Sequence, residues 1–253
     1  MSGSKSAKTI LKTRLDDILV ARGLAQTEKI AQAMIMAGKV RVDGQPAAKP
    51  GAMIAMNAPI EIAGGHQKYA SRAGLKLEGA FVDFGIDVKG FTCLDVGASN
   101  GGFTDCLLQH GASRVYAVDV NTAQLDWMLQ RDARVVAIKK NARYLKAGDL
   151  RENPDFMCID VSFISVTKIL SAVAALAKPG AELLILIKPQ FELPKRFVGK
   201  GGIVSDPEYH ERAIASVNGA AERAGLEVFG VKPSRITGAE GNQEFFLHAR
   251  RIR

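Results

Sequence analysis

The sequence has few of the residues that build disulfide frameworks or metal centres. Its three cysteines (Cys93, Cys106 and Cys158) are scattered, odd in number and without the paired spacing of a zinc site. The four histidines also lack metal-ligand spacing. We therefore predict no metal cofactor, and we interpret the cysteines as buried or inert thiols of a protein in a reducing cytosol.

Long apolar runs are absent as well. The longest, LLILI at 183–187, is far shorter than the roughly 20 residues that a membrane-spanning helix needs. The opening MSGSKSAKTILKTR is basic and polar and lacks the hydrophobic core of a signal peptide. We also find no basic amphipathic helix of the membrane type. We predict a cytoplasmic protein with no membrane partner and interpret residues 1–13 as a basic tail; the alternative is an organellar presequence.

What the chain does have is an uneven distribution of charge. The net charge is +8, and residues 1–72 hold eleven Lys or Arg against five Asp or Glu, a net +6. A basic module joined to a nearly neutral body is typical of proteins that bind a polyanion. The alternative, which charge alone leaves open, is an ordinary solvated basic surface.

Residues 14–62 predict a small α+β domain that begins with two helices. RLDDILVARGL places apolar side chains on one helical face, and Gly23 is a stop signal. Thr27 is predicted to cap the second helix, in which Met34 and Met36 would fill the core.

Short strands are predicted after these helices. KVRVDGQP alternates apolar and polar residues and turns at Asp43-Gly44, a hairpin signal, and MIAMNAPIEI supplies further strand pieces. The stretch at 63–70 has the composition of a linker.

Residues 71–253 predict a second, larger domain in which apolar strands alternate with helices. The predicted strands are 91–96, 114–120, 134–138, 156–161 and 182–188, and the predicted helices are 102–110, 122–131, 165–178 and 207–224. This alternation indicates an α/β, Rossmann-like, mostly parallel sheet with helices on both faces. Strands near 226–232 and 244–250 have no helix between them and should pair antiparallel at the sheet edge.

The first of these strands ends in a glycine-rich turn, LDVGASNGGF at 94–103. The dinucleotide fingerprint needs glycine at 97, 99 and 102, and Ser99 breaks it. Asp95 is also a poor neighbour for a pyrophosphate, which argues against a nicotinamide-dependent reductase. S-adenosylmethionine (SAM) fits better, because it carries a sulfonium and an ammonium group that Asp95 can face.

The ends of the next two strands support this cofactor. Asp119 ends VYAVDV and can accept hydrogen bonds from both ribose hydroxyls, and Asn141 can bond the adenine edge. The alternative is that the acids merely cap their strands. The predicted cofactor-binding residues are Asp95, Gly97, Ala98, Ser99, Gly101, Gly102, Phe103, Asp119, Asn141 and Asp160.

Three more polar residues fall at strand ends on the same rim. Asp160 ends FMCID, Lys188 ends LLILIK, and Glu244 begins the final strand. A lysine that closes an apolar strand is expected to be partly desolvated, which suits a catalytic amine, although a lone lysine can also snorkel to solvent. Lys76, on a predicted amphipathic helix at 69–81 with Leu75 among its packing residues, has the pattern of an ordinary surface lysine.

Several uncommon strings resemble one family over nearly the whole chain. SRAGLKL, CLDVGASNGGFTDCLL, DVSFIS, IKPQFE, GGIVSDP and GNQEFFL are similar to the TlyA, or haemolysin-A-type, ribosomal RNA 2′-O-methyltransferases. The resemblance implies an FtsJ-like methyltransferase domain over 71–253, SAM as cofactor, and transfer of a methyl group to a ribose, expected to be that of a cytidine, in ribosomal RNA or ribosomal subunits. It also implies a catalytic tetrad of Lys76, Asp160, Lys188 and Glu244.

The front module resembles an S4-like RNA-binding domain through RLDDILVARGL and AGKVRVDGQPAAKPG. It departs from the family at Thr27-Glu28, where Ser-Arg is usual, so an expected phosphate-contacting arginine is replaced by an acid. Two other classes of protein remain as alternatives: a non-catalytic RNA-binding or ribosome-assembly protein, and the membrane-acting haemolysin that the family's older name implies.

Overall fold

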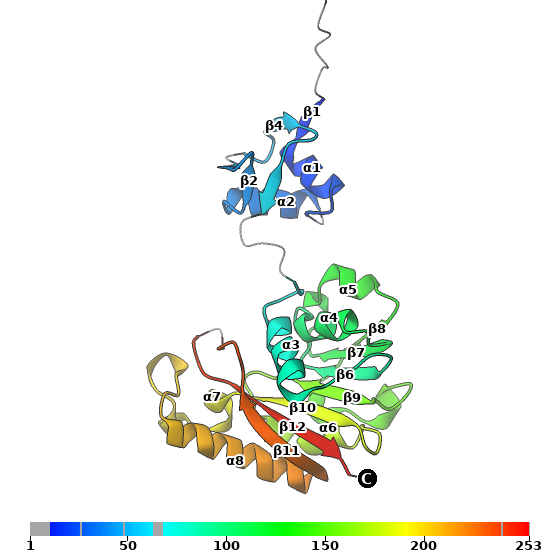
Figure 1. Ribbon diagram of the computed structural model, residues 1–253, viewed down its shortest axis with the longest axis vertical. Coiled ribbons are helices and arrows are strands. Elements are labelled where there is room, and N and C mark those ends of the chain that lie inside the picture. Colours follow the sequence, from blue (N-terminus) through cyan, green and yellow to red (C-terminus); the bar gives the residue numbers. More distant parts are fainter. Residues whose placement is uncertain (1–10, 26, 48, 63–67, 239, 253) are drawn as a thin grey trace, which may run out of the picture. The chain divides into compact units, whose positions relative to one another are not determined.

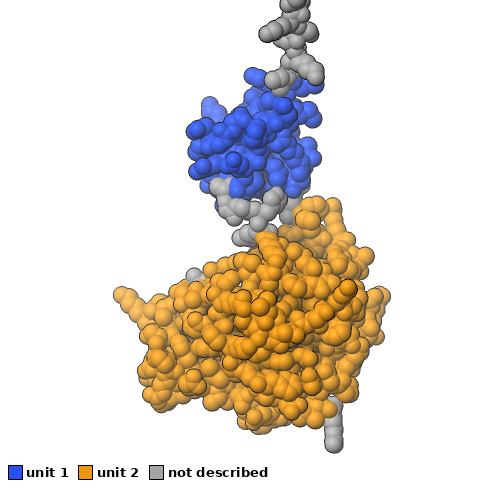
Figure 2. Space-filling view, in the orientation of Figure 1, with its two compact units in different colours: residues 1–67 blue, residues 68–253 orange. Residues whose placement is uncertain are grey.

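A computed structural model describes residues 11–25, 27–47, 49–62, 68–238 and 240–252. The chain divides into two compact units, residues 1–67 and 68–253, each with its own hydrophobic core (Figure 2). Residues 1–10 of the predicted tail and 63–67 of the predicted linker lie outside the described residues. The last part of the predicted tail is not a tail, because Lys12–Arg14 form a strand.

In its described residues, the first unit is an α+β domain of two helices and five short strands. Its elements are β1 (Lys12–Arg14), α1 (Leu15–Ala21), α2 (Glu28–Met36), β2 (Val40–Val42), β3 (Gln45–Pro46), β4 (Met53–Ala55) and β5 (Ile60–Ile62). Strand β1 pairs with β4, and β2 lies between β3 and β5, all antiparallel. The predicted turn at Asp43-Gly44 joins β2 to β3 with both φ angles positive, as a two-residue hairpin requires.

Local signals place the two helices of this unit correctly. Gly23 follows α1 with φ of +69°, and the Thr27 hydroxyl accepts a hydrogen bond from the Ile30 N–H (3.2 Å) at the start of α2. The prediction for Met36 is wrong. Met34 packs against the core, but Met36 is the last residue of α2 and is 78% exposed.

The second unit is built on one seven-stranded sheet (Figure 1). Its strands are β6 (Thr92–Val96), β7 (Arg114–Asp119), β8 (Val135–Lys139), β9 (Phe156–Ile159), β10 (Glu182–Ile187), β11 (Leu226–Pro233) and β12 (Phe245–Arg251). The order is β11-β12-β10-β9-β6-β7-β8, and β12 runs antiparallel to both neighbours. The predicted Rossmann-like, mostly parallel sheet with an antiparallel strand at one side is confirmed, with β11 rather than β12 at the edge.

Helices cover both faces of this sheet. Helices α3 (Ala73–Phe84), α4 (Gly102–Gln109) and α5 (Trp127–Arg131) pack on one face, and α6 (Leu170–Ala174) and α8 (Pro207–Arg223) pack on the other (Figure 1). Successive strand residues point to opposite faces, so the buried strands supply both cores: Leu94 and Val96 belong to one, Cys93 to the other. All three cysteines are buried, as predicted. No helix in the described part of the chain is long and apolar enough to cross a membrane.

Two predicted helices are shorter than expected. The segment predicted at 122–131 is a 3₁₀ turn (Thr122–Gln124) followed by α5, because Asp126 is extended and caps α5 by accepting from the Met128 N–H (2.8 Å). The segment predicted at 165–178 is likewise a 3₁₀ turn (Val166–Lys168) and the five-residue α6.

The topology places a crevice beyond the end of β6. From β6 the chain builds β7 and β8 on one side and then returns to build β9 and β10 on the other. Open α/β sheets bind ligands at such a switch point, outside the carboxyl ends of the strands. The glycine-rich turn at 97–102 lies at this position.

Candidate active site

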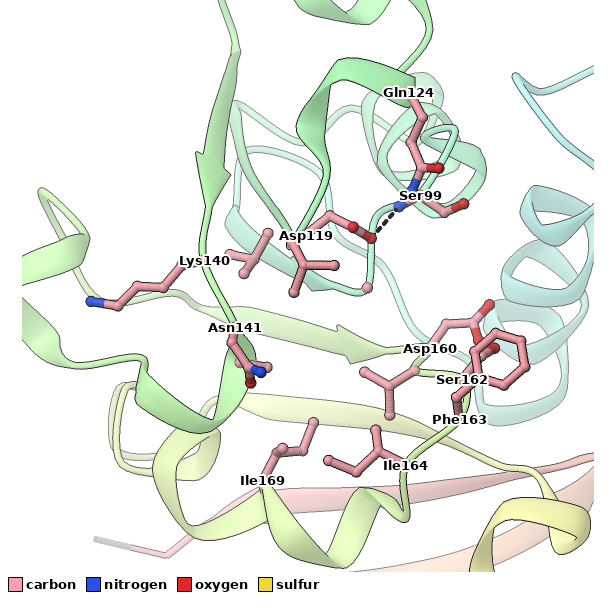
Figure 3. Close-up of a pocket in the computed structure, with 15 residues that line it drawn as sticks. Ser99, Asp119, Gln124, Lys140, Asn141, Asp160, Ser162, Phe163, Ile164 and Ile169 are labelled. Carbon is pink, nitrogen blue, oxygen red and sulfur yellow. Dashed lines mark hydrogen bonds between the residues drawn. The ribbon is translucent and has the colours of Figure 1, made fainter.

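The glycine turn is shaped by contacts within the protein. Gly97 has φ of +91°, and a Cβ on it would lie 2.1 Å from the carbonyl oxygen of Asp160, so only glycine fits. Ser99 also has a positive φ, +48°, and donates its N–H to the Asp119 carboxylate (2.9 Å; Figure 3). The turn is therefore tied to the ends of both neighbouring strands.

A cavity of about 510 Å³ opens beside this turn. Asp119 and Asn141 line it, with Asp160 across from them (Figure 3). The Asn141 side-chain oxygen accepts from the Arg143 N–H (3.0 Å), which fixes the orientation of the amide. Lys140 points away and pairs with an acid outside the cavity, so the polar lining near Asp119 and Asn141 is acidic and neutral.

A second cavity of about 160 Å³ adjoins the first. Both are lined by Gly97, Ser99, Asp160 and Ser162, and the smaller one also by Lys188. Its remaining lining comes from the segment before and at the start of α3 and from the glycine turn, namely Ser71, Ala73, Ala98, Asn100, Gly102 and Phe103. The structure thus brings most of the predicted cofactor-binding residues to one continuous rim.

Two predicted cofactor-binding residues lie beneath this rim. Asp95 is fully buried, accepts a hydrogen bond from the Thr104 hydroxyl (2.6 Å) and lines neither cavity. Burial raises the pKa of Asp95 to about 7. Gly101 also lies outside both linings, and a Cβ there would lie 2.2 Å from Leu129. Asp95 and Gly101 therefore stabilise the turn through contacts inside the protein.

Lys188 is buried and lines the smaller cavity. It follows β10 and is 8% exposed. Its Nζ forms an ion pair with Asp160 and donates a hydrogen bond to the Ser162 hydroxyl (2.9 Å). Asp160 and Ser162 come from the segment that follows β9, the strand adjacent to β10.

A second buried ion pair joins α3 to the start of β12. Lys76 Nζ lies 2.5 Å from a Glu244 carboxylate oxygen, and the two residues are 6% and 2% exposed. The interpretation of Lys76 as a surface lysine, made from the helical pattern alone, is therefore wrong. The prediction for Leu75 is wrong in the opposite direction. The helical pattern placed it among the packing residues, and its side chain is 39% exposed.

Sheet register brings the two ion pairs together. Ile187 on β10 pairs with Phe245 on β12 in antiparallel register, so the next residues outward, Lys188 and Glu244, are neighbours at the sheet rim. Asp160, next to Lys188, and Lys76, next to Glu244, complete the group. Asp160, Lys188 and Glu244 thus lie at strand ends, and Lys76 reaches Glu244 from α3.

One aromatic residue at this rim could not be identified from the sequence. Phe163 lines the larger cavity, is 93% exposed and has φ of +65°. Its ring lies against that of Phe191, with centroids 5.4 Å apart. Nothing in the spacing of DVSFIS separates this phenylalanine from one that packs in a core.

The family matches cover almost the whole described chain. Residues 69–251 match the FtsJ-like methyltransferase family, and residues 13–59 match the S4 domain. Among solved structures, fibrillarin from Aeropyrum pernix with bound S-adenosyl-L-methionine covers 83% of this chain and 81% of its own, with a TM-score of 0.51 and 17% identity, a likeness of fold.

Curated relatives are similar over nearly their full length. The 16S/23S rRNA (cytidine-2′-O)-methyltransferase TlyA of Mycobacterium tuberculosis is 42% identical over 94% of this chain and 90% of its own. Hemolysin A of Brachyspira hyodysenteriae is 40% identical over 93% of this chain and 98% of its own. The chain belongs to the FtsJ-like methyltransferases, in the TlyA-type branch that carries an S4 domain in front of the methyltransferase domain.

Proposed function

We propose that the protein is a SAM-dependent methyltransferase that methylates a ribose 2′-hydroxyl, that of a cytidine, in ribosomal RNA. The observation that carries the proposal is the pair of buried lysine–carboxylate contacts beside the cavity of a methyltransferase fold. Relatives named as rRNA (cytidine-2′-O)-methyltransferases support the substrate.

The residues around the cavity fit SAM. A volume of about 510 Å³ lies within the usual range of small-molecule sites. Each Asp119 oxygen accepts one backbone N–H (2.9 Å) and keeps lone pairs that can accept ribose hydroxyls. Asn141 can bond a base edge, and the acids near the turn suit a cation better than a phosphate. When bound, SAM supplies an electrophilic methyl group on its sulfonium.

The tetrad would then act on the RNA hydroxyl. Lys188 reaches the 2′-oxygen, Asp160 holds Lys188, and Glu244 holds Lys76 beside them. Much of the rate comes from alignment of the hydroxyl oxygen with the methyl group. In one version Lys188 is the general base that accepts the hydroxyl proton; in the other both lysines stay charged and steer the hydroxyl and the neighbouring phosphate.

The buried lysines also count against a non-catalytic protein. Lysine is almost never fully buried unless it is paired, and a buried ion pair is often no more stable than packed apolar residues. Folding alone gives no reason to keep two such pairs, Lys76–Glu244 and Lys188–Asp160, at one rim.

The S4 unit would supply affinity and register. Contacts of basic side chains with phosphates position a protein on RNA without reading sequence, and the target ribose must come from an accessible nucleotide. We propose ribosomal subunits as the physiological partner, which implies the cytoplasmic location predicted from the sequence.

One experiment tests the function directly. Purified protein is incubated with methyl-labelled SAM and unmodified 30S or 50S subunits. Alkaline hydrolysis of RNA requires a free 2′-hydroxyl, so a methylated ribose is mapped by the resistance of the adjacent phosphodiester bond to alkali. Label on a cytidine ribose is the expected result. Label only on a base, or no label on either subunit or on naked rRNA, would contradict the proposal.

A further inference from the structure

The hydroxyl of Ser162 occupies a place in the site that the tetrad does not account for. Lys188 Nζ donates to it (2.9 Å) and pairs on another side with Asp160. A lysine nitrogen has three positions besides its bond to carbon, filled by three N–H groups when charged or by two N–H groups and a lone pair when neutral. Ser162 accounts for one of these positions by a hydrogen bond, and the Asp160 carboxylate, the ion-pair partner of Lys188, lies close enough to take a second.

The third position is therefore the one that can face substrate. Lys188 is 8% exposed, whereas its partner Ser162 is exposed. If Lys188 acts as a base, its two N–H groups go to Asp160 and Ser162 and the lone pair points in the remaining direction. If Lys188 stays charged, the third N–H points there instead. In either version two partners are needed to fix the direction.

Ser162 lies where the two cavities meet. It lines both the larger cavity, with Asp119 and Asn141, and the smaller one, with Lys188. Figure 3 places it next to Asp160 on one side of the larger cavity. A hydroxyl at this junction is beside the path from the cofactor site to the amine.

The backbone around Ser162 is fixed on both sides. Before it, the Asp160 N–H donates to the Val96 carbonyl (2.9 Å). After it, the Glu192 carboxylate accepts from the Ser165 hydroxyl (2.6 Å) and the Val166 N–H (2.9 Å).

The next residue is held in an unfavourable conformation. Phe163 has φ of +65°, which is uncommon for a bulky residue and persists only where surrounding contacts impose it. The left-handed turn leaves Phe163 exposed while Ser162 bonds to Lys188.

We propose that Ser162 is a positioning residue that, together with Asp160, aims the Lys188 amine at the ribose hydroxyl. It forms no bond to the methyl group and acts only through Lys188. The inference rests on the proposed 2′-O-methylation and adds to it a residue outside the tetrad.

The test compares Ser162→Ala, Ser162→Thr and Ser165→Ala in single-turnover methylation of the subunit that the wild-type protein labels. We expect Ser162→Ala to lower the rate 10- to 100-fold with the SAM dissociation constant within about twofold, and to change the pH–rate profile. Ser162→Thr keeps a hydroxyl and should recover most of the rate. Ser165→Ala loosens the same segment without touching Lys188 and should cost less than about threefold, with an unchanged profile.

Two outcomes would overturn the inference: a Ser162→Ala rate within twofold of wild type, or equal losses in Ser162→Ala and Ser165→Ala with no recovery in Ser162→Thr. If Ser162→Ala does not fold, Ser162→Gly removes the same hydroxyl without added bulk and replaces it. A wild-type protein that labels no 2′-hydroxyl would instead contradict the proposed function, so the two failures are distinct.

Discussion

Two fully buried aspartates, one in each unit, have opposite electrostatic environments. Asp16 accepts hydrogen bonds from the Arg14 guanidinium (2.6 and 3.0 Å) and from Gln32 (3.0 Å), and the bond to Arg14 holds the pKa of Asp16 down at about 2. Asp95 has the Thr104 hydroxyl as its close partner, and burial raises its pKa to about 7. Asp16 is paired with a cation, and Asp95 is not.

The two units also differ in that the methyltransferase unit buries two of its lysines. Lys12, Lys39 and Arg41 of the S4 unit are exposed, whereas Lys76 and Lys188 of the methyltransferase unit are buried. Exposed cations act on RNA through phosphate contacts that salt weakens. Buried pairs act through fixed geometry and are screened far less. This difference supports the proposal that the S4 unit supplies RNA affinity and the methyltransferase unit supplies the chemistry.

The largest expected effect is that of Lys188→Ala. It should lower turnover by about 10³-fold or more, because it removes the group that we propose contacts the ribose hydroxyl. The SAM dissociation constant should change little, and the loss should be the same at low and high salt. Methyl incorporation and calorimetric titration measure the two quantities.

Lys178→Ala is the matched control for that variant. Lys178 is also paired with an acid, Asp155 (2.6 Å), but its side chain is exposed and outside both cavities. It should retain wild-type turnover. Wild-type turnover in Lys188→Ala would contradict the proposed mechanism.

Asp95→Asn should change the pH dependence of stability. The pKa of Asp95 is raised from about 4 in the unfolded chain to about 7 in the folded protein, so its contribution is present below pH 4 and is lost as the pH rises through 7. Asparagine can still accept from Thr104 but does not ionise.

The free energy of unfolding of Asp95→Asn should therefore fall less between pH 5 and pH 8 than that of wild type, by an order of 1 kcal/mol or more. The single tryptophan, Trp127, lies in the methyltransferase unit, so its fluorescence during urea unfolding follows this unit alone. Identical pH dependences in the two proteins would show that Asp95 is not the group responsible.

Deletion of residues 1–62 should act on RNA binding and leave the cofactor site intact. We expect a 10- to 100-fold loss of rRNA affinity at about 100 mM salt and a shallower dependence of affinity on salt, because exposed phosphate contacts are removed. SAM affinity should stay within about twofold, since both cavities are lined by residues 71–188. Unchanged RNA binding at moderate salt would mean that the S4 unit has another role.

The smallest expected effect is a gain in RNA affinity from Glu28→Arg. Glu28 accepts from Gln32 (2.9 Å) and lies 3.7 Å from Arg14, so it partly neutralises that arginine. The reversal removes the Glu28 carboxylate from beside Arg14, which stays paired with Asp16, and restores the basic residue that the family resemblance leads us to expect. Affinity for rRNA should rise severalfold, with a salt slope steeper by about one.

Glu61→Arg supplies the control for the charge change. Glu61 is exposed on β5 of the same unit, and its reversal adds the same net charge at a different place. It should tighten binding less than Glu28→Arg does. Equal gains from both variants would show that the S4 unit responds to total charge and that position 28 has no special role.

The fold was predictable because its signals are local. Each strand of the large sheet is a short apolar run, and the observed strands begin and end within about two residues of the predicted ones. The errors fall where a capping contact decides the outcome, as at Asp126, which splits a predicted helix in two.

Only the site residues that lie at strand ends could be predicted from the sequence. Asp119, Asp160, Lys188 and Glu244 each adjoin a strand, so the topology alone brings them to one edge. Lys76 is different, because its burial depends on a partner 168 residues away, and no helical pattern contains that information. The prediction of Lys76 as a site residue came from the family resemblance alone.

The sequence pattern also could not predict how deeply a side chain at a strand end is buried. Asp95 occupies a strand position whose side chain points under the glycine turn, towards Thr104, and the sequence could not distinguish this from a position that faces the ligand. The contact of Asp95 with SAM stays a prediction, and the structure offers the carboxylate as support for α4.

The insertion of β12 between β10 and β11 has a consequence for synthesis of the protein. Phe245 follows its partner Ile187 by 58 residues, so β10 has an unpaired apolar edge while the ribosome makes the intervening chain. At about 5–20 residues per second this interval lasts seconds. Glu244 is made just before Phe245, so the edge of β10 and the proposed tetrad are completed by the same late segment of the chain.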